Sequence, residues 1–554
     1  MGMVGAVTGV SLFLSFLCLS FGADSFRWAP TGDAVFLYAD LSRVLNKVSE
    51  RFLSVAIDAS LLAEEKFMYL LSSQKLRTLA KALTPGFLRF GGTKQDFMVF
   101  TPHNKSAAAP QSHAVPLQSV LHQSSLSAEG LCKTLMLPVS LEEKLKVAWA
   151  EQEVLLQKEE IQGSFQKVRF SEHAVDLLYS FANCSGFDLI FGLNALLRTR
   201  NNSWDSCNAE TLLSYCESKQ YVMSWELGNE PNSYEKKAGI CVDGHQLGLD
   251  FLHLREILNK SKLYSSAGLY GPDIGQPKDH RKDLLPGFLE TAAKAIDACT
   301  WHHYYVNGRE TSIDDFLSPQ VLDTLAAKIT TVLQTVALVS PGMKIWLGET
   351  SSAYGGGAAG LSDTFVAGFM WLDKLGLAAK LGIDVVVRQV LIGSGTYHLV
   401  DANLDPLPDY WLSVLYKRLV GPEVLDAAAF TDSAIPKRKL RVYLHCTNKQ
   451  SPNFRKGSVT LFALNLSKKV MEIILPLRVN RSSIDAYVLE AGRTGTRALK
   501  SRLIRLNGVV LKMPDDNTLP SLHGVSLNPG HPVRLPGHSF AFYVLKDASV
   551  PVCW

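Results

Sequence analysis

The sequence has little net charge, few cysteines and no long apolar run after its first residues. The formal net charge is only +4 over 554 residues, which excludes a nucleic-acid binder that works through the charge of the whole molecule. The nine cysteines show no metal-ligand spacing, so we expect no metal site. No later segment combines the length and the lack of charge that a transmembrane helix needs. These absences favour a soluble globular protein.

The first residues are typical of a secretory signal peptide over residues 1–22. An apolar core at positions 10–19 is followed by small residues, and about ten apolar residues cannot span a bilayer. No Lys or Arg precedes the core, so a buried N-terminal anchor stays open as the alternative. Secretion agrees with candidate N-glycosylation triplets. They begin at Asn183, Asn201, Asn259, Asn465 and Asn480.

Between about residue 58 and residue 389, short apolar runs alternate with helix-length segments. The candidate strands span 52–57, 87–90, 189–193, 221–227, 298–303, 344–348 and 384–388. Candidate helices between them include 243–258, 318–339 and 362–381. This alternation indicates a parallel sheet, and seven or eight repeats indicate a closed (β/α)₈ TIM barrel, an α/β fold.

Two regions depart from this rhythm. Residues 105–162 include an acidic helical stretch over 141–160, and so long an insertion in a compact barrel is either functional or removable. After about residue 421 the pattern changes to alternating strands without helices, which predicts a C-terminal β-sandwich over 421–554. Cys446 and Cys553 lie near the ends of its first and last long strands, so a disulfide between them is the preferred pairing.

Two glutamates follow apolar runs, in the places where barrel strands present catalytic groups. Glu230 ends the run 224–230, and Glu349 ends the run 344–349. One such glutamate is more often a solvated loop residue, but a pair is the minimal equipment for cleaving a glycosidic bond. One carboxyl donates a proton and the other attacks, so their environments must separate their pKa values. Asn229 would direct its amide to the 2-hydroxyl of the sugar.

Two further motifs have simpler explanations. His302 and His303 could suggest a metal, but adjacent residues on a strand point to opposite faces, so one of them is expected in the core. The glycine run 355–357 could cradle a phosphate, yet no Lys-Ser or Lys-Thr follows it. We interpret it as a flexible loop beside the cleft.

Several motifs closely resemble the heparanase family, secreted endo-β-glucuronidases of glycoside hydrolase family 79. They are Asn229-Glu230-Pro231-Asn232, Trp346 to Gly357, Arg89 to Lys94, Phe181 to Gly186, Trp301 to Arg309 and Pro406 to Trp411. The resemblance covers nearly everything except the signal and the insertion. It implies cleavage of heparan sulfate with retention of configuration, Glu230 as acid/base, Glu349 as nucleophile, and no cofactor.

The resemblance also implies which residues contact the substrate. These are Asp58, Thr93, Asn229, Gln276, Lys278, Tyr304, Arg309, Gln389, Gly395 and Tyr397. The phenol of Tyr304 would hold the nucleophile, and the guanidinium of Arg309 would bind carboxylate or sulfate through two hydrogen bonds. The family likeness further pairs Cys132 with Cys184.

In this family a protease removes an internal linker from an inactive precursor. We therefore expect a small chain, 23–104, that contributes barrel strands and possibly a sandwich strand, and an excised linker, 105–162. The large chain would hold the barrel, 163–420, and the sandwich, 421–554. The two chains would stay together as a noncovalent heterodimer, secreted to the extracellular matrix and found in lysosomes.

The sequence departs from the family in the basic cluster that begins the large chain. Ser164 and Gln166 replace expected lysines, and the cluster 276–283 places two aspartates among three fixed cations. Since heparan sulfate is densely anionic, this predicts lower affinity or an altered sulfation preference. Two alternatives stay open. One is a non-catalytic heparan sulfate-binding homologue, which the intact Gly348-Glu349-Thr350 disfavours, and the other is an exo-acting glucuronidase of the same clan.

Overall fold

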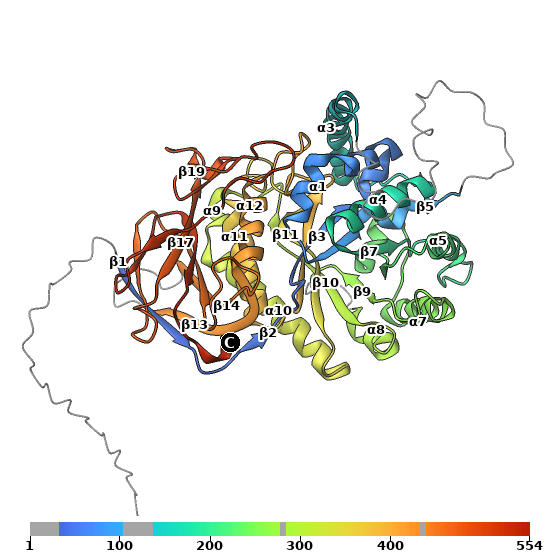
Figure 1. The fold of residues 1–554 in the computed structure, drawn as a ribbon. Helices are drawn as coiled ribbons and strands as arrows, with labels where there is room; N and C mark the ends of the chain where they lie inside the picture. Colours follow the sequence, from blue (N-terminus) through green and yellow to red (C-terminus); the bar gives the residue numbers. More distant parts are fainter. Residues whose placement is uncertain (1–32, 103–136, 278–283, 431–438) are drawn as a thin grey trace, which may run out of the picture.

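A closed barrel of parallel strands forms the centre of the molecule (Figure 1). The computed structural model describes residues 33–102, 137–277, 284–430 and 439–554, so the expected signal peptide lies outside the described residues. Around the barrel the strands follow the order β10-β11-β12-β3-β4-β7-β8-β9. They span β3 Leu53–Asp58, β4 Phe87–Gly91, β7 Asp188–Leu193, β8 Ser224–Leu227, β9 Leu269–Ile274, β10 Ala298–Asn307, β11 Ile345–Tyr354 and β12 Val385–Ile392. The predicted barrel is confirmed.

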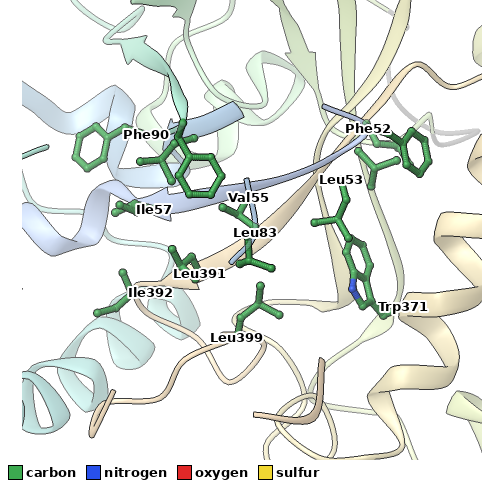
Figure 2. Close-up of a cluster of buried hydrophobic side chains, with 14 of the residues drawn as sticks. Phe52, Leu53, Val55, Ile57, Leu83, Phe90, Trp371, Leu391, Ile392 and Leu399 are labelled. Carbon is green, nitrogen blue, oxygen red and sulfur yellow. The ribbon is translucent and has the colours of Figure 1, made fainter. Parts of the chain in front are cut away.

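Both faces of the barrel strands are buried, which explains their nearly continuous apolar runs. In β3, Val55 and Ile57 belong to the large outer core, whereas Ala56 belongs to a separate core inside the barrel. Successive side chains of a strand point to opposite faces, so one strand serves both cores. Figure 2 shows part of the outer core, with side chains from β3, β4 and β12 and with Trp371 at one side of the view.

Helices surround the barrel (Figure 1). The longer ones are α1 Gln74–Lys81, α4 Glu172–Ser185, α5 Cys207–Ser218, α7 Gly244–Lys260, α8 Leu285–Ala292, α10 Pro319–Val339, α11 Ala367–Lys380 and α12 Pro408–Leu419. The helices expected at 243–258, 318–339 and 362–381 correspond to α7, α10 and α11. The start of α10 follows from its sequence, because the Ser318 side chain accepts a hydrogen bond from the Val321 amide and Pro319 occupies the first helical position.

Strand β9 is the barrel strand that the sequence pattern does not reveal. It contains Gly271 and Pro272, which are typical of turns, and proline cannot donate a ladder hydrogen bond. A glycine is required at position 271, because a Cβ there would lie 2.3 Å from the ring of Phe251. The missed strand brings Asp273 into the barrel, where it becomes part of the site described below.

A second domain of mostly antiparallel strands lies beside the barrel (Figure 1). Its strands are β1 Asp33–Asp40, β2 Asn46–Lys47, β13 Val420–Phe430, β14 Leu440–Thr447, β15 Val459–Asn465, β16 Met471–Ile474, β17 Ile484–Ala491, β18 Ile504–Leu506, β19 Val509–Val510, β20 Val525–Leu527, β21 Val533–Leu535 and β22 Ser539–Leu545. They enclose their own apolar core. A disulfide joins Cys446 to Cys553. The domain agrees with the expected sandwich.

Strand β1 comes from the start of the described chain but lies in this second domain. It pairs antiparallel with β13 and parallel with β16. The chain before residue 103 therefore contributes strands to both domains, since β3 and β4 belong to the barrel.

The acidic stretch predicted at 141–160 forms one long helix, α3 (Val139–Gln162). It is not a solvated appendage, because Leu145, Trp149 and Leu156 are buried. The ring of Trp149 lies 5.1 Å from the ring of Phe67 in the 3₁₀ segment η2 (Glu65–Ser72). Three apolar side chains thus dock α3 on the segment that follows β3.

One helix corrects the expectation that no later segment could span a membrane. By length and composition alone, α10 is apolar enough to cross a bilayer. In the fold it packs against β10, α8 and α11, and Leu322, Leu325 and Ile329 are buried. The apolar face of α10 therefore packs against the barrel.

One candidate glycosylation site is wrong. Asn465 lies in β15 and is fully buried, and its side-chain amide donates to the carbonyls of Lys469, Leu535 and Pro536 at 2.7, 3.3 and 3.0 Å. A glycan on this nitrogen would require those bonds to break. Asn183, Asn201 and Asn259 are exposed, and Asn480 is partly buried, so these four stay predictions.

Candidate active site

Glu230 stands directly beyond the end of β8, in a strained backbone conformation. Its φ of 54° and ψ of 61° lie in the left-handed region, which is uncommon for a residue with a side chain. The backbone amide of Glu230 donates to the carbonyl of Asp273 at 2.9 Å. Pro231 then opens the short 3₁₀ segment η5 (Pro231–Ser233). This turn directs the carboxyl group into the mouth of the barrel.

Glu349 lies on β11 at a bulge. In the ladder with β10, Trp301 faces Leu347 but the next residue, His302, faces Glu349. In the ladder with β12, the register shifts again between Leu347 and Thr350. One extra residue in β11 re-aims the following side chain, which is a common use of bulges near active sites. A glycine is needed at 348, where a Cβ would lie 2.5 Å from Asp273 Oδ1.

Two donors hold the carboxylate of Glu349. Arg89 Nη1 donates to Oε2 at 2.8 Å, and the hydroxyl of Tyr304 donates to Oε1 at 2.7 Å. Burial first, and then the Glu349 charge, raise the pKa of Tyr304 well above its ordinary value. Tyr304 therefore stays protonated and remains a donor. The contact expected between Tyr304 and Glu349 is present.

Arg89 is the centre of a buried charge network. Besides Glu349, its guanidinium donates to Glu226 Oε2 at 2.7 Å and to Asn229 Oδ1 at 2.9 Å, and it is fully buried. Burial and the neighbouring Asp273 raise the pKa of Glu226 to about 8 against the opposing effect of Arg89. The carboxyl group of Glu226 therefore binds a proton more readily than that of an ordinary glutamate.

His302 links Glu230 to the rest of this network. Its Nδ1 lies 3.3 Å from Glu230 Oε1, and its Nε2 lies 3.2 Å from Asp273 Oδ1. Burial lowers the pKa of His302, but the surrounding carboxylates outweigh it and raise the pKa to about 9. With both ring nitrogens facing carboxylates, the imidazolium is the form that fits.

The environment of Glu230 keeps its carboxyl group ionised. Burial raises its pKa, but the charges and hydrogen bonds of Lys237 and His302 outweigh burial and hold the pKa below the ordinary value. Lys237 Nζ lies 3.3 Å from Glu230 Oε2. The lowered pKa of Glu230 is opposite to the raised pKa that a proton donor needs. A change in the position of Lys237 would therefore change the pKa of Glu230.

The two histidines behave as the strand pattern predicts. His302 faces the carboxylates inside the barrel, whereas His303 is buried on the other face, where burial and then Lys374 hold its pKa well below the ordinary value. One oxygen each of Glu230 and Glu349 and one nitrogen of His302 lie within 4.8 Å of one another, a spacing that an ion could bridge. Arg89 and Lys237 already supply positive charge there, which disfavours a metal.

A cavity of about 510 Å³ opens above the two glutamates. Of the residues that the family likeness implies, those on its wall are Asp58, Thr93, Gln276, Tyr304, Arg309, Gln389, Gly395 and Tyr397. Asn229 is buried behind the wall with its Oδ1 on Arg89, and Lys278 lies outside the described residues. Gly355 and Gly356 also line the cavity, as expected for a loop beside the cleft.

The Asp58 carboxylate is held in place on this wall. Its Oδ2 accepts from Gln389 Nε2 at 2.6 Å, and its Oδ1 accepts from the Ser60 amide at 2.8 Å. Burial raises the pKa of Asp58 to about 6. Gly395 allows the neighbouring loop to approach, since a Cβ there would lie 2.9 Å from the ring of Tyr397.

Helix α3 contributes to the same cavity. Its last turn, including Glu159 and Glu160, forms part of the wall. Lys94 Nζ pairs with Glu159 Oε2 at 2.6 Å, and Arg309 Nη2 donates to the carbonyl of Glu160 at 3.4 Å. Burial raises the pKa of Glu160. The C-terminal end of the predicted linker thus binds two cationic side chains, Lys94 and Arg309, that line the cavity.

Sequence reasoning missed several residues of the site. Asp273 was hidden because β9 was not recognised. Lys237, in the short helix α6 (Tyr234–Ala238), stands seven residues after Glu230 but beyond the turn at Pro231–Ser233, so its nearness along the chain was the only signal of the contact. His302 was weighed only as a metal ligand, although its neighbour Tyr304 was assigned to the site.

Comparison with known proteins places this geometry in a family. Residues 144–376 match the model of glycosyl hydrolase family 79, N-terminal domain. The chain is 48% identical to bovine heparanase over 95% of its length and 94% of the relative, and 50% identical to chicken heparanase over 93% and 96%. It is 39% identical to mouse inactive heparanase-2 over 98% and 95%. A 4-O-α-L-rhamnosyl-β-D-glucuronidase from Fusarium oxysporum shares the fold, with a TM-score of 0.57, 15% identity and coverage of 92% and 100%.

Proposed function

This chain belongs to the heparanase family within glycosyl hydrolase family 79, and we propose that it is a retaining endo-β-glucuronidase that cleaves heparan sulfate. The observation that carries the proposal is the pair Glu230 and Glu349 in one cavity, with Glu349 held by Arg89 and Tyr304. An inactive relative also lies in the family, so the proposal depends on these groups rather than on overall identity.

The proposed reaction has two steps. Glu349 attacks the anomeric carbon of a glucuronic acid unit while Glu230 gives a proton to the leaving oxygen, which forms a glycosyl-enzyme ester. Glu230 then removes a proton from water, and the water displaces Glu349. Oxygens of the two carboxyl groups within 4.8 Å of each other support this route, because retaining enzymes hold their carboxyls about 5 Å apart and inverting enzymes need room for a water.

The low pKa of Glu230 gives Lys237 a role in this cycle. With α3 on the cavity wall, Lys237 pairs with Glu230 at 3.3 Å. This pairing favours the ionised form of Glu230, which suits the second step. An anionic substrate would attract the Lys237 ammonium toward its own carboxylate or sulfate. The pKa of Glu230 would then rise, and the proton needed in the first step would become available.

Cations around the cavity suit an acidic polysaccharide. Lys94, Lys236, Lys237 and Arg309 all line it, and their charges would raise the local concentration of an anionic chain. The replacement of expected lysines at Ser164 and Gln166 leaves fewer cations beside this wall. We propose that the enzyme therefore favours less densely sulfated stretches of heparan sulfate.

We further propose that the chain is made as a secreted precursor and activated when a protease removes residues 105–162. Helix α3 lies in this segment and closes part of the cavity through Glu159 and Glu160. Strand β5 (Met98–Phe100) before the segment pairs with β6 (Val168–Phe170) after it. Together with β1, β3 and β4, this pairing would hold the small and large chains together without a covalent link, in the extracellular matrix and in lysosomes.

The proposed small chain, residues 23–104, has no cysteine, so no disulfide could join it to the large chain. Cys184 is disulfide-bonded, and its proposed partner Cys132 lies outside the described residues. Because position 132 belongs to the removed segment, that bridge would tie the linker to the large chain in the precursor. It would not join the small chain to the large one.

Digestion of heparan sulfate, followed by chain-length analysis, tests the activity. The active two-chain protein is expected to give internal fragments of intermediate length, whereas Glu230→Ala and Glu349→Ala proteins give none. Release of single sugars from one end would instead support the exo-acting alternative. Undigested chains with wild-type protein, together with retained binding, would support the non-catalytic one.

A further inference from the structure

Lys374 is a buried lysine that the proposed reaction does not use. It lies on α11, outside the barrel wall, and is 1% exposed. No carboxylate forms an ion pair with it in the part of the chain that the structure describes. A buried ammonium without a counter-ion is costly, and burial holds the pKa of Lys374 well below its ordinary value. Such a group needs a reason to be there.

The contacts of Lys374 are all with the two strands that carry the site. Its Nζ donates to the Thr350 hydroxyl at 2.5 Å and to the carbonyls of Ser351 and His303 at 2.7 and 3.3 Å. It also lies 4.5 Å from the centre of the Tyr305 ring. Three acceptors match the three donors of an ammonium, and the ring face adds a favourable interaction.

These contacts begin directly after the irregular part of β11. The register of β11 shifts between Leu347 and Glu349 in the ladder with β10 and between Leu347 and Thr350 in the ladder with β12, so Glu349 lies at the irregular part of the strand. A slip of one residue would turn the Glu349 side chain away from the cavity, because successive side chains of a strand alternate between faces. Pairing with β10 resumes where His302 faces Glu349, and the next pair, His303 and Thr350, consists of residues that Lys374 contacts.

We propose that Lys374 is the positioning residue of the nucleophile: it fixes the register of β11 against β10 just after the bulge, so that Glu349 points at the anomeric carbon. Thr350 transmits the effect, since its hydroxyl accepts from Lys374 and donates to the carbonyl of His303. This inference rests on the proposed function, because it assumes that Glu349 is the nucleophile.

A covalent trap tests this role apart from substrate binding. A 2-fluoro glucuronide with a dinitrophenolate leaving group would form a slowly hydrolysed ester with the nucleophile and release the phenolate. In the two-chain enzyme, the mass increase is expected on Glu349. Lys374→Met should slow this labelling by about 100-fold, the cost of a small misplacement of a reacting group, while the affinity for heparan sulfate oligosaccharides changes by less than about threefold.

Matched variants separate positioning from stability. Lys417→Met removes a partly buried lysine, one that donates to the Pro85 carbonyl at the opposite end of the barrel, and should label at the wild-type rate. Thr350→Val should slow labelling, Thr350→Ser should restore it, and Thr350→Val should add little in the Lys374→Met background. If Lys374→Met does not fold, the Thr350 pair still decides the question.

The outcomes distinguish two failures. Wild-type labelling on a residue other than Glu349 would overturn both the proposed mechanism and the role of Lys374. Labelling on Glu349 at equal rates in wild type and Lys374→Met, or equal rates in Thr350→Val and Thr350→Ser, would overturn only the role of Lys374.

Discussion

Removal of one hydroxyl group from the active site should slow the proposed reaction by a predictable amount. Tyr304→Phe deletes the 2.7 Å hydrogen bond to Glu349 Oε1 and leaves the ring in place. A hydrogen bond to a charged group contributes about 1.5–3 kcal/mol, and each 1.4 kcal/mol is about tenfold in rate. Because the bond orients the attacking carboxylate, we expect kcat/KM to fall by about ten- to a hundredfold, with Arg89 still in contact.

The assay is the initial rate of cleavage of a heparan sulfate oligosaccharide of defined length, measured with the two-chain enzyme. Tyr416→Phe is the matched control. Its hydroxyl is buried and has no hydrogen-bond partner among the described residues, and Tyr416 lies away from the cavity, so the rate should stay within about twofold of wild type. A Tyr304→Phe enzyme that retains wild-type kcat/KM would refute the argument that this hydroxyl positions the nucleophile.

Three further perturbations follow from the structure. Lys237→Met removes a charge that depresses the pKa of Glu230. Since the first step needs protonated Glu230, activity is lost as pH rises through that pKa, and the alkaline limb of the pH profile of kcat/KM should move to higher pH. Lys236→Met, which changes an exposed neighbour, should leave this limb in place. Equal limbs in both variants would contradict this. Replacing Cys446 and Cys553 by Ala opens a loop of 107 residues and should lower the free energy of unfolding by about 4–5 kcal/mol, measured by denaturant unfolding; an unchanged value would contradict it. In the unprocessed chain, Trp149→Ala removes a fully buried side chain that anchors α3 and should give activity without proteolysis. Val154→Ala, at an exposed position of the same helix, should not. An inactive Trp149→Ala precursor would contradict the role of α3.

The barrel could be predicted from the sequence because its strands are buried on both faces and its helices are amphipathic. Strand β9 could not, since Gly271 and Pro272 interrupt the apolar run for reasons of packing against Phe251 that only the fold reveals. The place of β1 was equally hidden, because its partners β13 and β16 lie about 390 and about 440 residues away along the chain.

The two glutamates could be found from their places after apolar runs, but their environment could not. Arg89 interrupts an apolar pattern as a single charge, and Lys374 stands beside Asp373 in another. Only the three-dimensional contacts assign Arg89 to Glu349 and Lys374 to the strand that carries Glu349. Asn465 fits a glycosylation triplet because the triplet carries no information about burial. The acidic stretch of α3 did not reveal that three apolar side chains dock the helix on the fold, with its last turn on the cavity wall.

The anomeric configuration of the first product tests the central claim most directly. Proton NMR recorded from the start of digestion follows the new reducing-end glucuronic acid before its anomers equilibrate. With Glu230 and Glu349 as proposed, the wild-type enzyme should release the β-anomer first, on internal fragments, and the Glu349→Ala enzyme should release none. Initial release of the α-anomer, or wild-type cleavage by Glu349→Ala, would contradict the mechanism.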